Sequence, residues 1–369
     1  MSQQPEQTEI IVGEYGDVRD EEQLDWPKLA AYLRENRVPG ADSPMEVKQF
    51  RGGSSNLTYL MSFADGHEWV VRRPPFGPLP PSAHDMAREY RVLSRLWEAF
   101  GAAPRAILLC EDPAIIGAPF FVMERRKGEV IKNRQPLPPG LDARPETLRQ
   151  LSESFVDTLA DLHAVDYEKI GLGGLGRPDG FFQRQITGWM GRWEKAKTHE
   201  VPLMNRLGAW FLENLPPAQK PTLLHNDFYL HNAMFDAKTG RVVGVFDWEM
   251  STLGDPMIDL GTMLGYWRDP DDPEDLIDLS QGHAHTTMPG FLKRDELIGR
   301  YARRSGRDVT WADYYRAWAN WKTATVVEQI YVRFVRGQTT DPRFETMGAQ
   351  APVLARQAAR VLVRYGFKE

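Results

Sequence analysis

The stretch Leu224-His225-Asn226-Asp227-Phe228-Tyr229-Leu230-His231-Asn232, followed fifteen residues after Asn232 by Asp247-Trp248-Glu249, decides how this sequence is interpreted. Asp227, Asn232 and Asp247 carry side-chain oxygens, which bind hard cations or accept protons. Whether the three can act together depends on how the chain folds between Asn232 and Asp247.

The spacing predicts a β-hairpin between these two segments. Residues 233–236 and 241–246 can pair across the intervening turn, which places Asn232 opposite Val245. Asp247 follows Val245 by two residues, and because side chains alternate along a strand it points to the same face as Asn232, roughly 7 Å along the strand. The register therefore predicts two oxygen ligands on one face.

Such an arrangement suits phosphoryl transfer from a magnesium-bound nucleotide. Nucleotide-bound magnesium uses one or two protein oxygens and completes its octahedron with water and phosphate, which Asn232 and Asp247 would satisfy. Asp227, on the preceding loop, is then free to accept a hydrogen bond from an attacking hydroxyl. Phosphoryl transfer depends on positioning and charge neutralisation more than on covalent chemistry, which favours this division of roles.

A second motif, Gly254-Asp255-Pro256-Met257-Ile258-Asp259-Leu260, is typical of a helix start. Asp255 is placed to cap the helix, and Pro256 suits its first position. Asp259 then lies among apolar helical residues, where a carboxylate must be satisfied by buried donors.

Together these motifs resemble the aminoglycoside phosphotransferase and choline kinase-like family. The family's catalytic loop reads His-x-Asp-x-x-x-x-Asn, as His225 to Asn232 does here, and its metal-binding Asp opens an Asp-x-x segment, as Asp247 does. Residues 254–260 are similar to its Gly-Asp-Pro-x-x-Asp-Leu signature. The Gly-Gly-Ser-Ser-Asn-Leu-Thr-Tyr loop (52–59) and the Arg-Arg-Pro-Pro segment (72–75) look most like the kinase-like domains associated with acyl-CoA dehydrogenases.

The resemblance implies an α+β, protein-kinase-like fold with a β-rich N-terminal lobe and an α-rich C-terminal lobe. It implies ATP, with GTP as the alternative, and Mg2+ as cofactors, and the hydroxyl of a small molecule as phosphate acceptor. Asp227 would be the catalytic residue, and Asn232 and Asp247 the metal ligands. His225 is expected to support the loop by hydrogen bonding, and Asp259 to accept hydrogen bonds from the loop backbone.

The N-terminal part has the pattern of an antiparallel sheet with one inserted helix. The pair Asp65-Gly66 suits a tight hairpin turn. A helix is expected after Ser82, which can cap it, and Glu89 projects from the apolar stripe of that helix, so Glu89 needs a cationic partner. Five segments separated by Gly and Pro are predicted strands: 47–51, 57–63, 68–73, 106–110 and 119–124.

By resemblance, this lobe binds the nucleotide. Its Gly-Ser loop would cover the phosphates with backbone amides and hydroxyls. Arg72 stands where kinases have a lysine, so it would bind the α- and β-phosphates and pair with Glu89. Arg73 is the alternative, because only one of two adjacent strand residues can point inward. The predicted nucleotide-binding residues are Gly53, Ser54, Ser55, Asn56, Arg72, Glu89, and the linker residues Met123, Glu124 and Arg125.

Beyond residue 124 the helical pattern dominates. We expect residues 1–24 to be a flexible acidic tail, 25–124 the N-terminal lobe and 125–369 the C-terminal lobe, with one β-hairpin at 222–247 interrupting its helices. The predicted helices of the C-terminal lobe are 147–163, 181–197, 203–215, 295–304, 311–336 and 351–365.

Composition excludes other classes of partner. At 369 residues and 42% hydrophobic the chain can form two cores, and a net charge of −6 gives no basic stripe for nucleic acid. No apolar run is long enough to cross a bilayer, and the acidic N-terminus is unlike a signal peptide. Cys110, the single cysteine, is predicted to be an inert core residue. We expect a cytoplasmic monomer or homodimer.

The sequence does not identify the molecule that accepts the phosphoryl group. Trp248, Glu249 and Trp267 lie near the expected acceptor site and are candidates for contacting it. Hydroxyacyl-CoA compounds are favoured by the resemblance, and aminoglycosides or choline-like amino alcohols are alternatives. A nucleotide-binding pseudokinase is an alternative function, because Arg72 stands where active kinases have a lysine. A metal-dependent hydrolase built on His225 and Asp227 would need further histidine ligands.

Overall fold

The structure, a computed structural model, describes residues 15–50, 56–77, 85–132, 135–281, 283–339 and 341–368. The chain divides into two compact units. The first comprises the N-terminal part up to Ser94 together with Pro104–Arg125, and the second comprises Arg95–Ala103 together with Arg126 onward.

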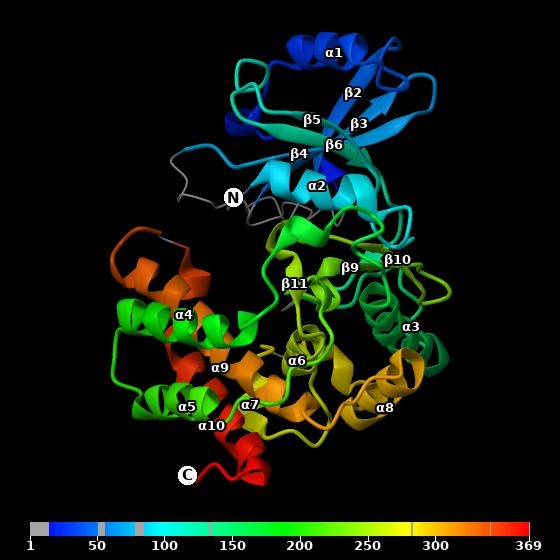
Figure 1. Cartoon of the computed structure of the whole chain (residues 1–369). Coiled ribbons are helices and arrows are strands. Elements are labelled where there is room, and N and C mark those ends of the chain that lie inside the picture. Colours follow the sequence, from blue (N-terminus) through cyan, green and yellow to red (C-terminus); the bar gives the residue numbers. More distant parts are fainter. Residues whose placement is uncertain are drawn as a thin grey trace, which may run out of the picture. The chain divides into compact units, whose positions relative to one another are not determined.

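The first unit is built on one antiparallel sheet of six strands in the order β1-β2-β3-β4-β6-β5 (Figure 1). Five of them are the predicted strands. The sixth, β1, comes from residues expected in the flexible tail, which is a correction: Tyr15 pairs with Phe50 and stacks edge-on against its ring. The strands are β1 (Tyr15–Gly16), β2 (Met45–Phe50), β3 (Leu57–Phe63), β4 (Glu68–Arg73), β5 (Ala106–Cys110) and β6 (Phe120–Glu124).

The core of this unit lies between helix α1 (Trp26–Glu35) and one face of the sheet. Leu29 and Leu33 are fully buried among a cluster that includes Tyr59, Val71 and Phe120. Tyr59 and Val71 lie opposite each other on this face, because side chains alternate along β3 and β4. The predicted inserted helix is present as α2 (Met86–Leu96), whereas its expected cap Ser82 lies outside the described residues.

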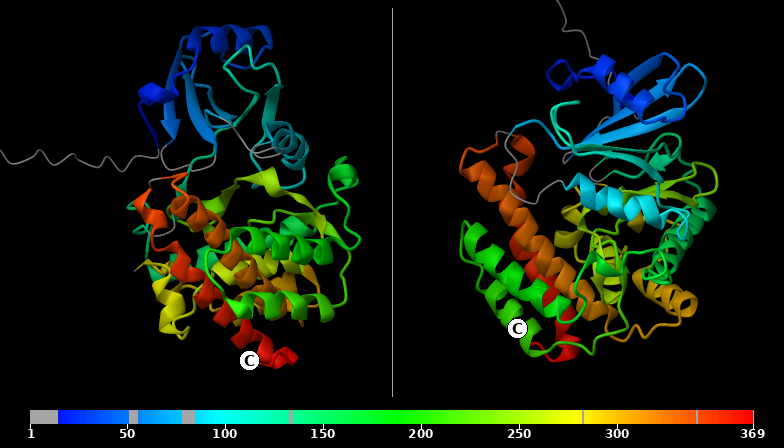
Figure 2. Two further views of the ribbon diagram at one scale, coloured as in Figure 1. Left: turned by 90° about the vertical axis from the view of Figure 1, so that its left-hand side faces the viewer. Right: turned by 45° about the horizontal axis from the view of Figure 1, so that its top comes forward.

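The second unit is mostly helical, as predicted. The long helix α9 packs against α4, α6 and α10, and the views in Figures 1 and 2 show α9 in orange beside α10 in red. Its helices are α3 (Pro145–His163), α4 (Phe181–Ala196), α5 (Pro202–Glu213), α6 (Met257–Tyr266), α7 (Glu274–Asp278), α8 (Arg294–Ser305), α9 (Ala312–Val335) and α10 (Gln350–Leu362).

Two small sheets interrupt these helices, where one hairpin was expected. Strand β8 (Thr222–Leu224) does not join the hairpin but pairs with β11 (Thr252–Gly254), which ties the residues just before His225 to the segment after Asp247. The hairpin of β9 (Ala233–Phe235) and β10 (Val242–Val245) is extended by β7 (Glu129–Val130) into a second sheet.

The register of the hairpin corrects the predicted one. An irregularity between Val242 and Gly244 shifts the pairing by one residue, so Val245 lies opposite Ala233. Asn232 consequently pairs with Phe246, whose N–H donates to the Asn232 carbonyl at 2.8 Å, and not with Val245. The extra residue of a bulge bends a strand locally, and the alternation of faces across it no longer holds.

Among the described helices, none combines the length and the apolar character that crossing a membrane requires.

Close packing of α6 on α9 gives a first prediction. A Cβ added to Gly261 would lie 2.5 Å from the backbone carbon of Tyr315, so Gly261→Ala should lower the free energy of unfolding by on the order of 2 kcal/mol through overpacking. Urea denaturation of the purified chain measures this change.

Gly188 on α4 is the matched control, since an added Cβ there meets no atom within 4 Å. Gly188→Ala should stabilise the protein by about 0.5–1 kcal/mol because alanine favours the helix. Equal changes in the free energy of unfolding for Gly261→Ala and Gly188→Ala would contradict the close packing of α6 on α9.

Candidate active site

The catalytic loop is held in shape by one buried carboxylate, as the sequence predicts. Asp259, in the first turn of α6 and fully buried, accepts from the His225 N–H at 2.7 Å with Oδ2 and from the Asn226 N–H at 2.7 Å with Oδ1. Asn226 has a left-handed φ of +69°, a conformation that asparagine adopts more readily than most residues. Both loop amides thereby point toward α6.

Asp259 is itself part of a buried network. Its Oδ2 lies 3.3 Å from His163 Nε2, and His163 Nδ1 lies 2.7 Å from the Tyr301 hydroxyl. Burial lowers the pKa of His163, which keeps the ring neutral, so that Nε2–H can donate to Asp259 while Nδ1 accepts from Tyr301. Asp255 caps α6 as expected, accepting from the Met257 N–H at 2.9 Å.

His225 supports the loop and is not free to act as a base or a metal ligand. Its ring is fully buried, with Nε2 2.9 Å from the Phe246 carbonyl and Nδ1 accepting from the Asp227 N–H at 3.3 Å. Since a carbonyl can only accept, Nε2 carries the proton. Both ring nitrogens are therefore occupied, which argues against a metal-dependent hydrolase built on His225.

Asn232 joins the other two site residues. Its side-chain Nδ2 donates to the Asp227 carbonyl at 2.9 Å, and its own carbonyl accepts from Phe246, the residue before Asp247. The amide nitrogen is thus committed to the protein, and Oδ1 is the atom left to bind a cation. Oδ1 and the Asp247 carboxylate are hard oxygen donors, the kind that magnesium prefers.

Asp247 is close enough to Asp227 for its negative charge to affect the pKa of Asp227. It adopts a left-handed φ of +69° at the end of β10, where the strand gives way to a 3-10 helix (Trp248–Met250). The pKa of Asp227 is raised, mainly because burial disfavours the charged carboxylate. The positive charge of Lys322 lowers this pKa, and the negative charge of Asp247 raises it. The Asp227 side chain nevertheless keeps about a third (34%) of its surface accessible to solvent, enough for a substrate to reach it.

Lys322 is a site residue that sequence reasoning missed. It lies on α9, far from the motifs in sequence, with Nζ 3.5 Å from Asp227 Oδ1 and 3.4 Å from the Asn226 carbonyl. The available signal was a single charge within the otherwise apolar or neutral stretch 317–327 of a buried helix.

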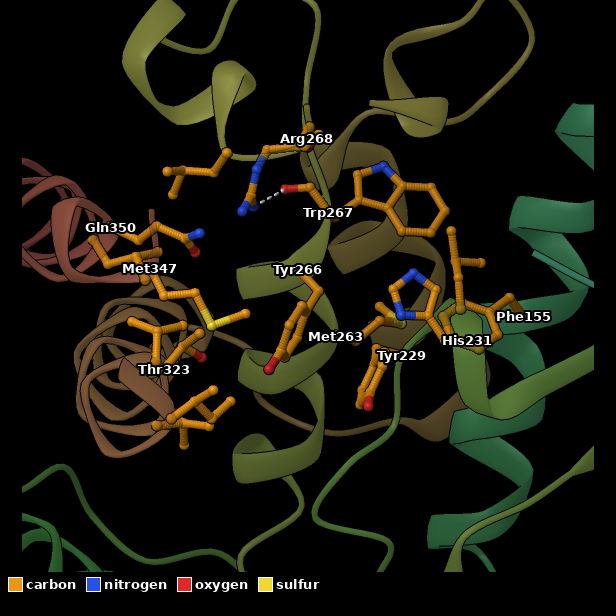
Figure 3. Close-up of a pocket in the computed structure, with 17 residues that line it drawn as sticks. Phe155, Tyr229, His231, Met263, Tyr266, Trp267, Arg268, Thr323, Met347 and Gln350 are labelled. Carbon is orange, nitrogen blue, oxygen red and sulfur yellow. Dashed lines mark hydrogen bonds between the residues drawn. The ribbon is translucent and has the colours of Figure 1, made fainter. Parts of the chain in front are cut away.

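A pocket of about 270 Å³ lies beside the catalytic loop within the second unit (Figure 3). Tyr229 and Tyr266 stack there with ring centroids 4.6 Å apart, and Thr323, the neighbour of Lys322, lines it from α9. Arg268 is the one permanent cation among the described residues lining it. The apolar lining residues include Val326, Val327, Ile330, Met347 and Leu354.

The structure places the three residues expected to contact the phosphate acceptor in different surroundings. Trp248 is fully buried, donates to the Val245 carbonyl at 2.8 Å and packs against the His225 ring, so it is a core residue, which corrects the expected contact with substrate. Trp267 is also buried, yet its ring forms part of the pocket wall. Glu249 is partly exposed in the 3-10 helix, and its role stays a prediction.

In the first unit, the predicted pair of Arg72 and Glu89 is formed. Arg72 Nε lies 3.0 Å from Glu89 Oε2, and the Glu89 side chain is almost fully buried. Arg73 points to the opposite face, where it donates to the carbonyls of Pro74 and Ile116 and lies 4.1 Å above the Phe76 ring. Of the two arginines, Arg72 is therefore the one that pairs with α2, as expected.

The remaining predicted nucleotide contacts are only partly described. Gly53, Ser54 and Ser55 lie outside the described residues, and Asn56, which follows them, is buried. In the linker, Met123 pairs with Val70 and Ala106 inside the sheet. The Glu124 N–H donates to the Arg105 carbonyl at 2.9 Å, so this amide is not available to adenine. The Arg125 side chain pairs with Glu68, and the contact of the linker backbone with adenine stays a prediction.

The Asp259 network gives a second prediction. In Asp259→Asn one oxygen becomes an NH2 group that cannot accept, which leaves a buried loop N–H unsatisfied, and the free energy of unfolding should fall by on the order of 2 kcal/mol. Urea denaturation measures the loss. Asp161→Asn, which removes a half-exposed carboxylate paired with Arg304, is the control and should change stability little. Equal losses would contradict the proposed network.

Comparison with known proteins agrees with this geometry. The sequence profile of the phosphotransferase enzyme family matches residues 46–297. Acyl-CoA dehydrogenase family member 10 of Mus musculus is 32% identical over 343 residues, covering 92% of this chain and 31% of that protein. Acyl-CoA dehydrogenase family member 11 of Gallus gallus is 31% identical, covering 95% of this chain and 45% of that protein. The chain spans less than half the length of these two relatives.

Solved structures of phosphotransferases and kinases are also similar to this chain. A protein from Ralstonia eutropha, assigned provisionally as an aminoglycoside phosphotransferase, is 29% identical, with a TM-score of 0.78 over 93% of this chain and 99% of that one. Choline kinase from Cryptosporidium parvum shares the fold at 14% identity, with a TM-score of 0.57 over 93% and 98% of the two chains. These matches confirm the resemblance seen in the motifs: the chain belongs to the phosphotransferase enzyme family and has its α+β, protein-kinase-like fold.

Proposed function

We propose that this chain is a small-molecule kinase that transfers the γ-phosphoryl group of ATP to a substrate hydroxyl. The observation that carries the proposal is the position of Asp227. Its loop is fixed by Asp259, its carbonyl is bound by Asn232, and its carboxylate stays accessible to solvent. A carboxylate that only capped a turn would need neither the asparagine nor the nearby Asp247.

Asn232 and Asp247 would hold the magnesium of the nucleotide. The fixed Nδ2 of Asn232 orients its Oδ1, and Asp247 has a left-handed backbone just after β10, where the strand has ended. Bound there, magnesium would neutralise charge on the phosphate oxygens. Removal of magnesium should accordingly abolish transfer.

Asp227 would act on the acceptor. The acceptor oxygen forms a bond to the γ-phosphorus while the bond from that phosphorus to the β,γ-bridging oxygen breaks, and its electron pair leaves with ADP. The acceptor proton passes to Asp227. Because the pKa of Asp227 is raised, the carboxylate is a better proton acceptor than an ordinary aspartate.

The first unit would bind the nucleotide through Arg72. The Arg72–Glu89 pair orients the guanidinium, which can then contact the phosphates. This pair argues against a pseudokinase, the alternative that the exchange of lysine for arginine kept open, because the arginine still forms the expected ion pair with the helix. GTP is the alternative nucleotide.

The pocket beside the loop favours an acyl acceptor over a cationic one. Its described lining residues include Arg268 and no carboxylate, so an amino alcohol or aminoglycoside would find no anionic partner there. Arg268 is buried, and both of its side-chain hydrogen bonds come from Nη1, which donates to the carbonyls of Gly265 and Trp267, so Nη2 has no partner among the described residues. A guanidinium with a spare donor suits a carbonyl or carboxylate oxygen, and the aliphatic wall suits a hydrocarbon chain. Hydroxyacyl compounds, including CoA esters, combine both features.

A third prediction tests the reaction. A screen of magnesium-ATP consumption over hydroxyacyl-CoA esters, hydroxy acids, choline analogues, sugars and aminoglycosides should find an acceptor. Asp227→Asn should reduce turnover of that acceptor by about 10²- to 10⁴-fold, the usual contribution of a general base. Asp247→Ala should abolish it at every magnesium concentration.

The control for both variants is Asp271→Asn, which alters a carboxylate that is 73% exposed and should leave turnover unchanged. Wild-type turnover in Asp247→Ala would refute the metal role.

A fourth prediction concerns the acceptor pocket. Arg268→Met should reduce kcat/KM for hydroxyacyl acceptors by about 10- to 100-fold, the value of one charged hydrogen bond. Any turnover of amino alcohols should fall less. The ratio of kcat/KM for the two substrate classes, measured in the same variant, is an internal control for folding. A uniform loss across both substrate classes would exclude Arg268 from acceptor recognition.

A further inference from the structure

Lys322 is a cation whose position beside Asp227 is not explained by ordinary ion pairing. Its side chain is 14% exposed, and its ammonium lies 3.5 Å from Asp227 Oδ1. Charge-assisted hydrogen bonds between an ammonium and a carboxylate are commonly about 2.7–2.9 Å long. The observed contact is longer than that, as is the 3.4 Å contact to the Asn226 carbonyl.

The surroundings of Lys322 pair its ammonium with one carboxylate and leave part of its hydrogen-bonding capacity unused. Nζ lies 5.6 Å from the ring centroid of Trp189 and 5.8 Å from that of Trp318, at the outer limit of cation–π contact. Asp227 is its one carboxylate partner, and one of its three N–H donors has no partner among the described residues. Partial burial of an ammonium is costly when it is incompletely paired. The ammonium is therefore able to bind a second anion.

We infer that Lys322 is a catalytic residue whose ammonium contacts the oxygens of the transferred phosphoryl group. The inference rests on the proposed function, which brings that group next to Asp227. In the loose transition state negative charge lies on the three equatorial oxygens of the phosphoryl group, close to the negative Asp227. A cation 3.5 Å from Asp227 Oδ1 relieves both the repulsion and the developing charge.

During the step Lys322 stays protonated and forms no bond to phosphorus. The acceptor proton goes to Asp227, and the electron pair of the broken bond leaves with ADP, so Lys322 contributes charge alone. Its side chain reaches the site from α9, which packs on α6, and α6 carries Asp259. The base and the cation are therefore held by two helices in contact.

The test uses a mimic of the transferred group, so it needs no knowledge of the acceptor. Binding of Mg·ADP to the full chain is measured by calorimetry with and without aluminium fluoride, which occupies the place of the phosphoryl group. Wild-type protein should bind ADP more tightly when fluoride complexes are present. Lys322→Met should reduce that enhancement by about 10²-fold while leaving the affinity for Mg·ADP alone unchanged.

Three further variants separate contact from mere positioning. Lys322→Arg, which keeps the charge, should retain part of the enhancement, and Arg333→Met, which removes an exposed cation from the same helix, should retain all of it. Lys322→Met should still lower the enhancement when introduced into Asp227→Asn. If it has no effect in that background, Lys322 acts only through Asp227, and the inferred contact is wrong.

The remaining outcomes are distinct. Full enhancement in Lys322→Met overturns the inference and leaves the proposed function standing. Absence of Mg·ADP binding or of any enhancement in the wild type overturns both.

Discussion

The site depends on two hydrogen bonds from the backbone of the catalytic loop to one carboxylate. Asp259 accepts from His225 and Asn226, and it does so from the first turn of a helix that is buried from Met257 to Gly265 and mostly apolar. The cost of burying that charge is offset only while both donors are present. The shape of the loop and the position of α6 therefore stabilise each other.

The other site residues follow from this constraint. With His225 fixed, its ring joins the loop to the end of β10 through the Phe246 carbonyl. Asn232 makes a second link to the same residue, so the segment that ends in Asp247 is tied to the loop at two points. Asp227, between these links in the chain, keeps about a third (34%) of its side-chain surface accessible to solvent. This geometry suits a group that must act on a substrate.

Much of the architecture could be predicted because the motifs carry local physical signals. The Asp65-Gly66 turn and alternating apolar residues define β3 and β4, and a carboxylate in an apolar helix required the donors that Asp259 has. The hairpin register could not be predicted, since a bulge near Val243 leaves no mark in composition. Lys322 and Arg268 were missed because they reach the site from α9 and from the end of α6, through tertiary packing that has no sequence motif.

The proposal that Asp227 directs phosphoryl transfer to a hydroxyl is tested most directly by phosphorus NMR of one reaction mixture. With magnesium-ATP and an acceptor, the wild-type chain should form one phosphomonoester for each ADP, and Asp227→Asn should form almost none. Release of inorganic phosphate without a phosphomonoester, at the same rate in both proteins, would contradict the proposal.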